Sequence, residues 1–327
     1  MSAYCQGLIL CEQPLIVYSS HYQAAAAAVN TLPSVIGDRE AIFLPLTGWT
    51  MERPGEIAAA RQYVERRREQ YPNHRIIFMS NTQEEVDGLC RAGVEAKKFS
   101  HNFTVSKDVF HPIEGVERRF DAVYNAQIAR WKRHELAQNI NRLILIYYNY
   151  DGNGLDYFNY LKETLKDADF ANEHMTDPPH SYLLPSLINQ LYAQSGCGLS
   201  LSAEEGANFA SIEYLLAGLP VVSTRNIGGR DEFFDSYNCL FAAENPVSVA
   251  EAVTEILGRN LDRNRIRNNT VEKQAHIVNE FCHFVNDLIK QHGGTSDIFT
   301  YWDKIYCNKL LHWCSLEEFL DLCRIET

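Results

Sequence analysis

The stretch that decides the fold is EGANFASIE, residues 205–213, which places two glutamates, Glu205 and Glu213, eight positions apart. An apolar, strand-like run, CGLSLS at 197–202, precedes it, and an apolar helical run, YLLAGL at 214–219, follows it. A strand that leads through a loop into a helix offers unpaired amides and a positive helix end, which suit a phosphate group. Carboxylates beside such a site accept hydrogen bonds from hydroxyl groups. The pattern therefore predicts a ligand that is part phosphate and part sugar.

This stretch resembles the E-x7-E motif of the retaining glycosyltransferases of family four, which have the two-domain GT-B fold. The family run is approximately S-E-G-F-G-x-P-x-x-E-A-M-A-x-G-x-P-V-V, followed by Gly-Gly. The chain departs from it at Asn208, which replaces the second glycine, and at Ala210, which replaces the proline, and it has one extra residue before Glu205. The matching positions are Ser202, Glu205, Gly206, Glu213, Ala217, Gly218, Pro220, Val221, Val222, Gly228 and Gly229.

The resemblance implies that Glu205 contacts the transferred sugar and that Glu213 binds the ribose hydroxyls of the donor. It also implies that the intervening loop lies against the diphosphate and the sugar. That loop comprises Gly206, Ala207, Asn208, Phe209 and Ala210. The alternative is an ordinary strand–loop–helix unit with two solvated glutamates.

A second segment, FDAVYNAQIARWKRH at 120–134, resembles the family strand and loop V-G-R-L-x-x-x-K-G, whose arginine and lysine hold the donor diphosphate. Lys132 matches the lysine, but Gln127 stands in place of the arginine. Arg130 or Arg133 would then supply the missing positive charge from nearby. The alternative is a basic surface segment whose cations are solvated.

Three parts are expected along the chain. VSKDVFHP at 105–112 resembles the family's crossing between domains. We therefore expect an N-terminal, acceptor-side Rossmann-like domain over 1–112 and a nucleotide-sugar-binding Rossmann-like domain over 113–294. Over 295–327 we expect either a helical return to the first domain, with Trp302, Tyr306, Trp313 and Phe319 on its apolar face, or a plain helical cap on the second domain. The fold class is α/β, with two doubly wound domains that face a central cleft.

Strands alternate with helical patterns in both halves, which indicates parallel sheets that bind ligands at the carboxyl ends of their strands. In the first half, Thr82 is a candidate helix N-cap. Strands are expected at 15–19, 41–44, 75–80, 120–124, 143–148, 197–202 and 239–241. Helices are expected at 23–29, 56–71, 155–170, from Pro246, and from beyond Asp262 to the last residue, with a turn at 151–156.

The composition excludes several classes of protein. A formal net charge of -12 argues against a nucleic-acid partner, because such surfaces need clustered Lys and Arg. Nine cysteines, with no C-x-x-C pair, indicate reduced thiols in a cytoplasmic protein. The arginines at 61 and 66–68 alternate with glutamates, which favours a solvated, ion-paired helix face. Contact with anionic lipid is the alternative, and it would place the protein peripherally at the inner face of the membrane.

Two further groups of polar residues have the composition of functional sites. Asp167-Ala168-Asp169 has the D-x-D spelling of metal-dependent glycosyltransferases, but it ends a helical pattern instead of following a strand, so no metal site is expected. His21 follows the first expected strand and His101 precedes the domain crossing, so both are candidates for the N-domain cleft.

The resemblance therefore implies a retaining, metal-independent glycosyltransferase without a cofactor. It would move a hexose from a nucleotide-diphosphate sugar, with UDP-glucose or a similar UDP-hexose favoured, to a glycan or lipid-linked glycan acceptor. Polysaccharide or glycoconjugate synthesis is the expected setting. One alternative is a phosphorylase-like GT-B enzyme. The other is a catalytically silent, sugar-nucleotide-binding scaffold, and the replacement of the arginine by Gln127 keeps this second alternative open.

Overall fold

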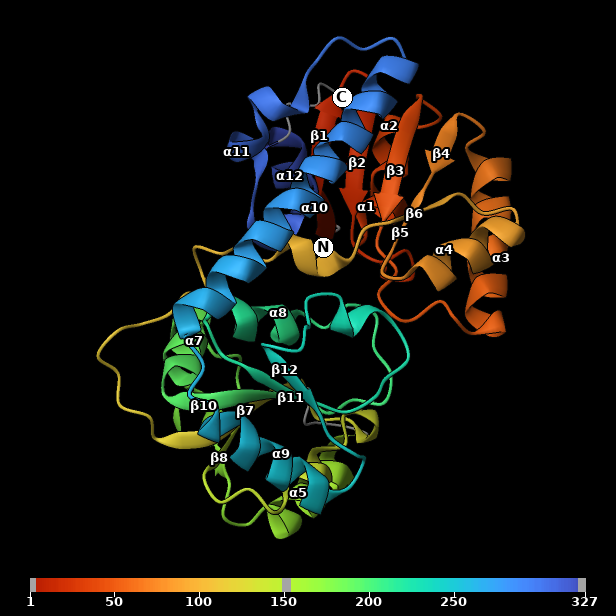
Figure 1. Ribbon diagram of the computed structural model, residues 1–327. Helices are drawn as coiled ribbons and strands as arrows, with labels where there is room; N and C mark the ends of the chain where they lie inside the picture. The colour runs from red at the N-terminus through yellow and green to blue at the C-terminus, as the bar shows by residue number, and fades with distance from the viewer. Residues whose placement is uncertain (1–3, 149–153, 323–327) are drawn as a thin grey trace. The chain divides into compact units, whose positions relative to one another are not determined.

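The computed structural model describes residues 4–148 and 154–322, and the chain divides into two compact units (Figure 1). Unit 1 comprises Met1–Ser106 and Gln274–Thr327, and unit 2 comprises Lys107–Lys273. The first crossing lies within the predicted segment 105–112. In the described ranges, no helix combines the length and the apolar character that a bilayer span requires.

The second crossing corrects the predicted domain boundaries, which were set after residues 112 and 294. It falls inside helix α10 (Arg263–Gln291), between Lys273 and Gln274. From Gln274 onward this helix packs on unit 1, since the Gln274 amide donates to the carbonyl oxygens of Phe103 at 2.9 Å and Val105 at 2.6 Å. The Phe281 ring lies 5.1 Å from that of Phe103, centroid to centroid. The return to the first unit therefore begins about one helix earlier than expected.

Unit 1 contains a five-stranded sheet in the order β13-β1-β2-β3-β4. Strands β2, β3 and β4 are parallel, whereas β1 is antiparallel to both β2 and β13. Their bounds are β1 Tyr4–Glu12, β2 Leu15–Ser19, β3 Ala41–Pro45, β4 His74–Ile76 and β13 His312–Ser315. A parallel pair, β5 (Phe78–Ser80) and β6 (Ala96–Lys98), completes the strands described in this unit.

Helices of unit 1 follow the predicted rhythm with one correction. The helix expected at 23–29 is limited to α1 (Ala28–Thr31), because the backbone before it bonds to β1 instead. The Gln6 amide donates to the Ala26 carbonyl at 2.7 Å, which removes that carbonyl from a helix. The other helices in the first 106 residues are α2 Pro33–Ile36, α3 Pro54–Gln70, α4 Gln83–Arg91 and a short 3-10 helix at His101–Thr104.

Thr82 is the N-cap of α4, as predicted. Its hydroxyl accepts from the Glu85 amide at 3.1 Å, and the Glu85 carboxylate reaches back to the Thr82 amide at 3.4 Å, which makes a capping box. The strand expected at 75–80 is split into β4 and β5, because the chain leaves the five-stranded sheet between them.

The segment beyond α10 corrects the expectation of helix to the last residue. Short helices, α11 (Trp302–Ile305) and α12 (Leu316–Leu322), flank strand β13, which pairs with β1. The Phe319 side chain is fully buried in the core of unit 1, as expected of an apolar face. Trp313 is instead 63% exposed, because it lies on the edge strand β13 beside Tyr4.

Unit 2 contains a six-stranded, fully parallel sheet in the order β12-β11-β10-β7-β8-β9. The strands are β7 Phe120–Gln127, β8 Leu143–Tyr148, β9 Asp169–Phe170, β10 Ser195–Ser200, β11 Val221–Ser223 and β12 Cys239–Phe241. From β7 the chain steps outward through β8 to β9, then returns to add β10, β11 and β12 on the other side. This is the strand order of a dinucleotide-binding Rossmann domain.

Helices connect these strands (Figure 1). They are α5 Leu155–Thr164, α6 Ala171–His174, α7 Pro185–Ala193, α8 Phe209–Leu216 and α9 Pro246–Gly258, followed by α10. The helix predicted at 155–170 stops at Thr164, because Asp169 and Phe170 pair with β8. The turn predicted at 151–156 begins outside the described residues, and Gly154 occupies the N-cap of α5.

Candidate functional site

Two loops leave the carboxyl ends of neighbouring strands in unit 2, at the point where the strand order reverses. Strands β7 and β10 lie side by side, but β7 leads the chain towards β8 and β10 leads it towards β11. Ligands of open parallel sheets bind in the crevice formed at such a reversal. The loop after β7 carries Lys132, and the loop after β10 carries Glu205. The topology thus places both predicted residues at one ligand-binding edge.

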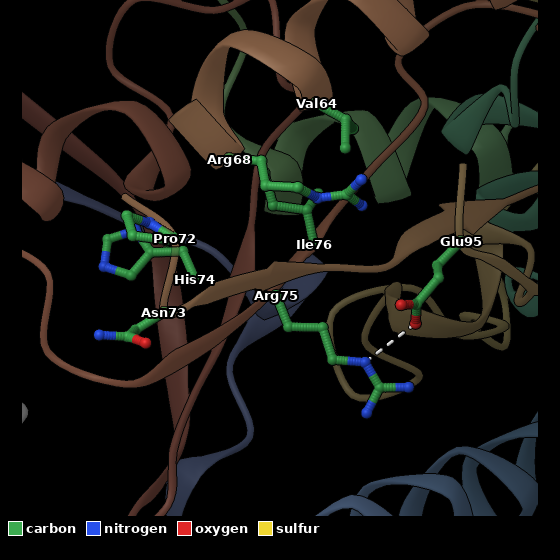
Figure 2. A pocket seen from close by; sticks show the side chains of 8 residues that line it. All are labelled: Val64, Arg68, Pro72, Asn73, His74, Arg75, Ile76 and Glu95. Atoms are coloured by element: carbon green, nitrogen blue, oxygen red, sulfur yellow. Dashed lines mark hydrogen bonds and ion pairs between the residues drawn. The ribbon is translucent and has the colours of Figure 1, made fainter. Parts of the chain in front are cut away.

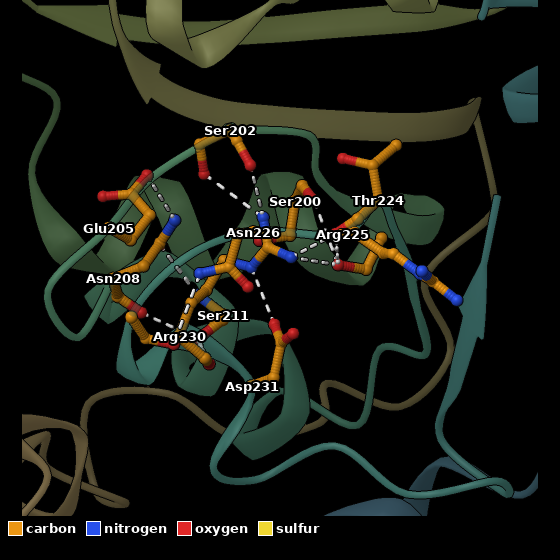
Figure 3. A network of polar contacts seen from close by, with 12 residues as sticks. Ser200, Ser202, Glu205, Asn208, Ser211, Thr224, Arg225, Asn226, Arg230 and Asp231 are labelled. Carbon is orange, nitrogen blue, oxygen red and sulfur yellow. Dashed lines mark hydrogen bonds and ion pairs between the residues drawn. The ribbon is translucent and has the colours of Figure 1, made fainter. Parts of the chain in front are cut away.

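Lys132 and Glu205 form a buried ion pair between the Nζ and Oε1 atoms. The two residues are 7% and 6% exposed. The Asn208 side-chain amide also donates to the same Oε1 at 3.1 Å (Figure 3). Because a charge withdrawn from water needs a partner, the pair holds both ionised groups in the crevice.

Asn208 stands where the resembling motif has a glycine, and its side chain makes contacts that a glycine lacks. Its φ of 68° lies in the left-handed region, which asparagine tolerates better than most residues. Its side-chain oxygen accepts from the Ser211 amide at 3.3 Å and caps α8. The same side chain therefore shapes the loop, starts the helix and contacts Glu205, and a glycine would do only the first of these.

Glu213 lies in the second turn of α8 and is 4% exposed. Its Oε2 accepts from the Tyr192 hydroxyl at 3.1 Å, and that hydroxyl accepts from the Asn125 amide at 2.7 Å. Burial, with the Glu213 charge as the next cause, raises the pKa of Tyr192 well above its ordinary value. Tyr192 is thus a protonated donor that orients the carboxylate.

Tyr148 ends β8 and lies in the field of both glutamates. Burial raises its pKa to about 12, and the charges of Glu205 and Glu213 are the next causes. Tyr148 pairs in register with Gln127, so it lies at the same carboxyl edge of the sheet as the loop after β7.

The other predicted cations lie apart from the Lys132–Glu205 pair. The Arg133 guanidinium donates to the Leu201 carbonyl at 2.6 Å and to the Thr224 hydroxyl at 2.7 Å, and it pairs with Glu244 at 3.0 Å. All of its nitrogens are engaged in holding loops together. Arg130 is exposed, with its guanidinium 5.2 Å from the centroid of the Tyr157 ring. Gln127 is the half-buried last residue of β7.

The loop between the two glutamates is compact. Gly206 and Ala207 are buried, whereas Phe209 and Ala210, which begin α8, are half-buried. The Gly206 carbonyl accepts from the Gly229 amide at 2.9 Å, so the predicted Gly-Gly pair braces this loop.

The two predicted histidines belong to unit 1. His101 is 4% exposed, and its Nε2 donates to the Met79 carbonyl at 2.9 Å, with burial lowering its pKa to about 4. It is a neutral residue that supports the fold. His21 is half-buried, and burial also lowers its pKa. Of the two, only His21 retains the accessibility that ligand contact requires.

Sequence reasoning missed four residues of this region: Asn125, Tyr148, Tyr192 and Arg230. Two of them left a signal. Tyr148 closes the predicted strand at 143–148, and Arg230 directly follows the Gly-Gly pair. Asn125 and Tyr192 are joined to Glu213 only by tertiary structure, and their spacing along the chain carries no signal.

Unit 1 has a separate hollow beside β4 (Figure 2). It has a volume of about 240 Å³, and its polar lining includes Arg68, His74 and Arg75, with Arg75 Nε paired to Glu95 at 2.9 Å. It contains none of the predicted residues. It lies at the start of β4, whereas parallel sheets bind their ligands at the carboxyl ends of strands.

Comparison with known proteins gives a match in structure alone. No family model matches the sequence, and no curated protein does either. Sucrose-phosphate synthase from Thermosynechococcus elongatus has a TM-score of 0.60 and 12% identity, covering 84% of this chain and 74% of that protein. HepE of Anabaena in complex with UDP has a TM-score of 0.55 and 14% identity, over 80% and 76%. The pneumococcal O-GlcNAc transferase GtfA in complex with UDP and GlcNAc has a TM-score of 0.53 and 11% identity, over 76% and 53%.

These similarities concern the fold. The chain has the α/β fold of GT-B glycosyltransferase structures, as the sequence predicted.

Proposed function

We propose that this protein is a retaining glycosyltransferase of family four that transfers a hexose from a nucleotide-diphosphate sugar to a hydroxyl acceptor. The observation that carries the proposal is the buried Lys132–Glu205 pair at the strand-order reversal of unit 2, with Asn208 on the same carboxylate. A cation beside a sugar-directed carboxylate, in the loop that opens a helix, suits a ligand with both phosphate and hydroxyl groups.

In this proposal each site residue binds a different part of the donor. Glu213, held by Tyr192, would bind the ribose hydroxyls, and Glu205 would bind the transferred hexose. Lys132, with exposed Arg130 nearby in the chain, would neutralise the diphosphate as it leaves. Arg133 is omitted from this set because its guanidinium is already bonded within unit 2. The Gly206–Ala210 segment would line the diphosphate and sugar.

The chemistry needs no strong protein base at the anomeric carbon. In this proposal the leaving phosphate takes the acceptor proton on the face from which it departs, so the configuration is retained. The protein stabilises the charge that develops on the diphosphate. Because Lys132 supplies the positive charge that does this, turnover is expected to persist in EDTA. Loss of turnover in EDTA, with recovery on adding Mg²⁺, would contradict metal independence.

Uridine is the favoured base, with a UDP-hexose such as UDP-glucose as donor. HepE and GtfA, which are similar in fold, were each determined in complex with UDP. A glycan or lipid-linked glycan is the proposed acceptor. The proposal is tested by calorimetric titration with UDP, GDP and ADP, followed by NMR of the product from the donor that binds. An inverted anomeric centre, or donor binding without release of nucleotide diphosphate, would refute it, the latter in favour of a sugar-nucleotide-binding scaffold.

Glu213 gives a test of the ribose contact. A carboxylate that accepts from both ribose hydroxyls contributes about 1.5–3 kcal/mol, so Glu213→Ala is expected to raise the Kd for UDP by about tenfold or more. Calorimetry measures it, with Glu251→Ala on the exposed side of α9 as a matched control. A folded Glu213→Ala protein with unchanged UDP affinity would remove this residue from the site.

Glu205 separates the sugar from the nucleotide. Glu205→Gln keeps the shape of the side chain but loses the charge, so kcat is expected to fall by about tenfold or more while the Kd for UDP changes by less than about twofold. Steady-state kinetics and calorimetry on the same preparation check both values. If UDP affinity and kcat fall together, Glu205 acts by ordering the loop.

A further inference from the structure

Arg230 is a cation withdrawn completely from solvent, next to the proposed donor site. It has no exposed surface, and its carboxylate partner Asp231, at 2.8 Å from Nε, is only partly buried. Burying a guanidinium is unfavourable unless its donors are paired. In Arg230 all three nitrogens are engaged (Figure 3). Because every nitrogen of this guanidinium is bonded, the groups that accept its hydrogen bonds are held in fixed positions.

The bonds of Arg230 join the ends of two adjacent strands. Nη1 donates to the Ser202 carbonyl at 2.9 Å and to the Ser202 hydroxyl at 3.3 Å, just beyond β10. Nη2 donates to the Ser223 hydroxyl at 2.8 Å and to the Thr224 carbonyl, at the end of β11. The guanidinium therefore ties the start of the loop after β10 to the start of the loop after β11.

The backbone beside Arg230 holds the other side of the glutamate loop. The Gly229 amide donates to the Gly206 carbonyl at 2.9 Å. The Ser211 hydroxyl of α8, which donates to the Asn208 carbonyl at 2.7 Å, lies 3.3 Å from the Arg230 carbonyl. Glu205 therefore lies in the chain between two residues that are held in place. Arg230 binds Ser202, and the Gly229 amide binds Gly206.

We propose that Arg230 is a positioning residue that sets the direction of the Glu205 carboxylate, and with it the Lys132–Glu205 pair. The inference rests on the proposed function. With no exposed surface, Arg230 acts on the donor only through the loop that it holds. Glu213 depends on α8 and Tyr192 instead, so the ribose contact does not need the guanidinium. Loss of Arg230 should affect the sugar step more than nucleotide binding.

Lysine cannot replace the guanidinium here. Arginine presents five donors in a planar fork that reaches carbonyls on two strands at once, whereas lysine has one compact ammonium. Arg230→Lys therefore retains the charge and loses the geometry, which makes it the informative variant. Arg225→Lys is the matched control, because its side chain is exposed and extends away from the network (Figure 3).

The experiment measures kcat, the KM for the donor and the Kd for UDP in the full chain. Misplacement by about 1 Å lowers turnover by up to about 100-fold, so Arg230→Lys is expected to lower kcat by about tenfold or more. The Kd for UDP should stay within about twofold, and Arg225→Lys should match the parent protein. In Arg230→Ala, guanidinium chloride at non-denaturing concentration should restore part of the lost kcat, and sodium chloride should not.

Three outcomes would overturn the inference: an unchanged kcat in folded Arg230→Lys, an equal loss of kcat and UDP affinity, or rescue by sodium chloride as well as by guanidinium. If neither Arg230 variant folds, Asp231→Ala decides, since it leaves the guanidinium in place with one bond fewer. It should lower kcat without changing UDP affinity, and an unchanged kcat would again refute the role. A parent protein that binds no nucleotide would instead refute the proposed function.

Discussion

Replacing Lys132 by methionine is expected to lower kcat by about 100-fold or more, while the Kd for the nucleotide sugar rises by less than about tenfold. The ammonium lies in the crevice on the Glu205 carboxylate, in a setting with little solvent. Charge on the diphosphate increases as the bond to the sugar breaks, so a fixed cation there stabilises the transition state more than the bound donor. Single-turnover and binding measurements separate the two quantities.

The same substitution also tests the ion pair itself. Methionine leaves the Glu205 charge buried and unpaired, which is expected to cost about 3–5 kcal/mol of unfolding free energy. Adding Glu205→Gln should recover much of that stability without recovering kcat, so the double variant distinguishes a folding defect from a chemical one. Normal turnover in folded Lys132→Met would mean that the diphosphate binds in another loop.

The second large effect is loss of stability in acid, carried by two buried histidines. Burial, with Lys132 as the next cause, lowers the pKa of His134 to about 3, and burial lowers that of His101 to about 4. In the unfolded chain both titrate near 6.5, so below that pH the unfolded state binds protons that the folded state does not. Their contribution to the free energy of unfolding is complete above pH 6.5 and is lost as the pH falls towards 4 and 3. By about pH 5 the loss amounts to about 2 kcal/mol per histidine.

His134→Phe is expected to flatten this pH dependence. The His134 ring is fully buried and packs 4.7 Å from that of Tyr124, centroid to centroid, so an apolar ring suits the site. Urea unfolding at about pH 7 and about pH 5 should give a smaller difference than in the parent protein. The control is His276→Gln, whose side chain is 72% exposed and which should leave the difference unchanged. An equal difference in the parent and His134→Phe would disprove the assignment.

Elements with local signals could be predicted from the sequence. Strand β8 coincides with the apolar run 143–148, α9 begins at Pro246, and Thr82 caps α4, because periodicity, a first-turn proline and a capping box are all properties of neighbouring residues. Strand β13 was missed because it is defined by its pairing with β1, about 300 residues away in the chain, and β1 was missed although it also pairs with the adjacent β2. The shortened α1 has the same cause, since β1 bonds to the alanine run before it.

In the candidate site, too, local motifs could be predicted and contacts between distant residues could not. The positions of Glu205, Glu213 and Lys132 came from motifs, which are local in the chain. The sequence could not show that Lys132 and Glu205 pair across 73 positions, or that Arg133 is occupied by the Leu201 carbonyl while its neighbour is on Glu205. Those facts depend on how the loops after β7, β10 and β11 meet, which is set by the strand order of the whole unit.

The discontinuity of unit 1 has a consequence for the order in which the protein is made. Unit 2 is a single stretch, Lys107–Lys273, so all of its residues are synthesised before Gln274 is added. The first 106 residues must wait for α10, β13 and Phe319, which complete their sheet and core. Non-local pairing of this kind slows folding and leaves strand edges exposed in the meantime. During translation, the edge of β1 that faces β13 therefore stays unpaired until residues 312–315 have been made.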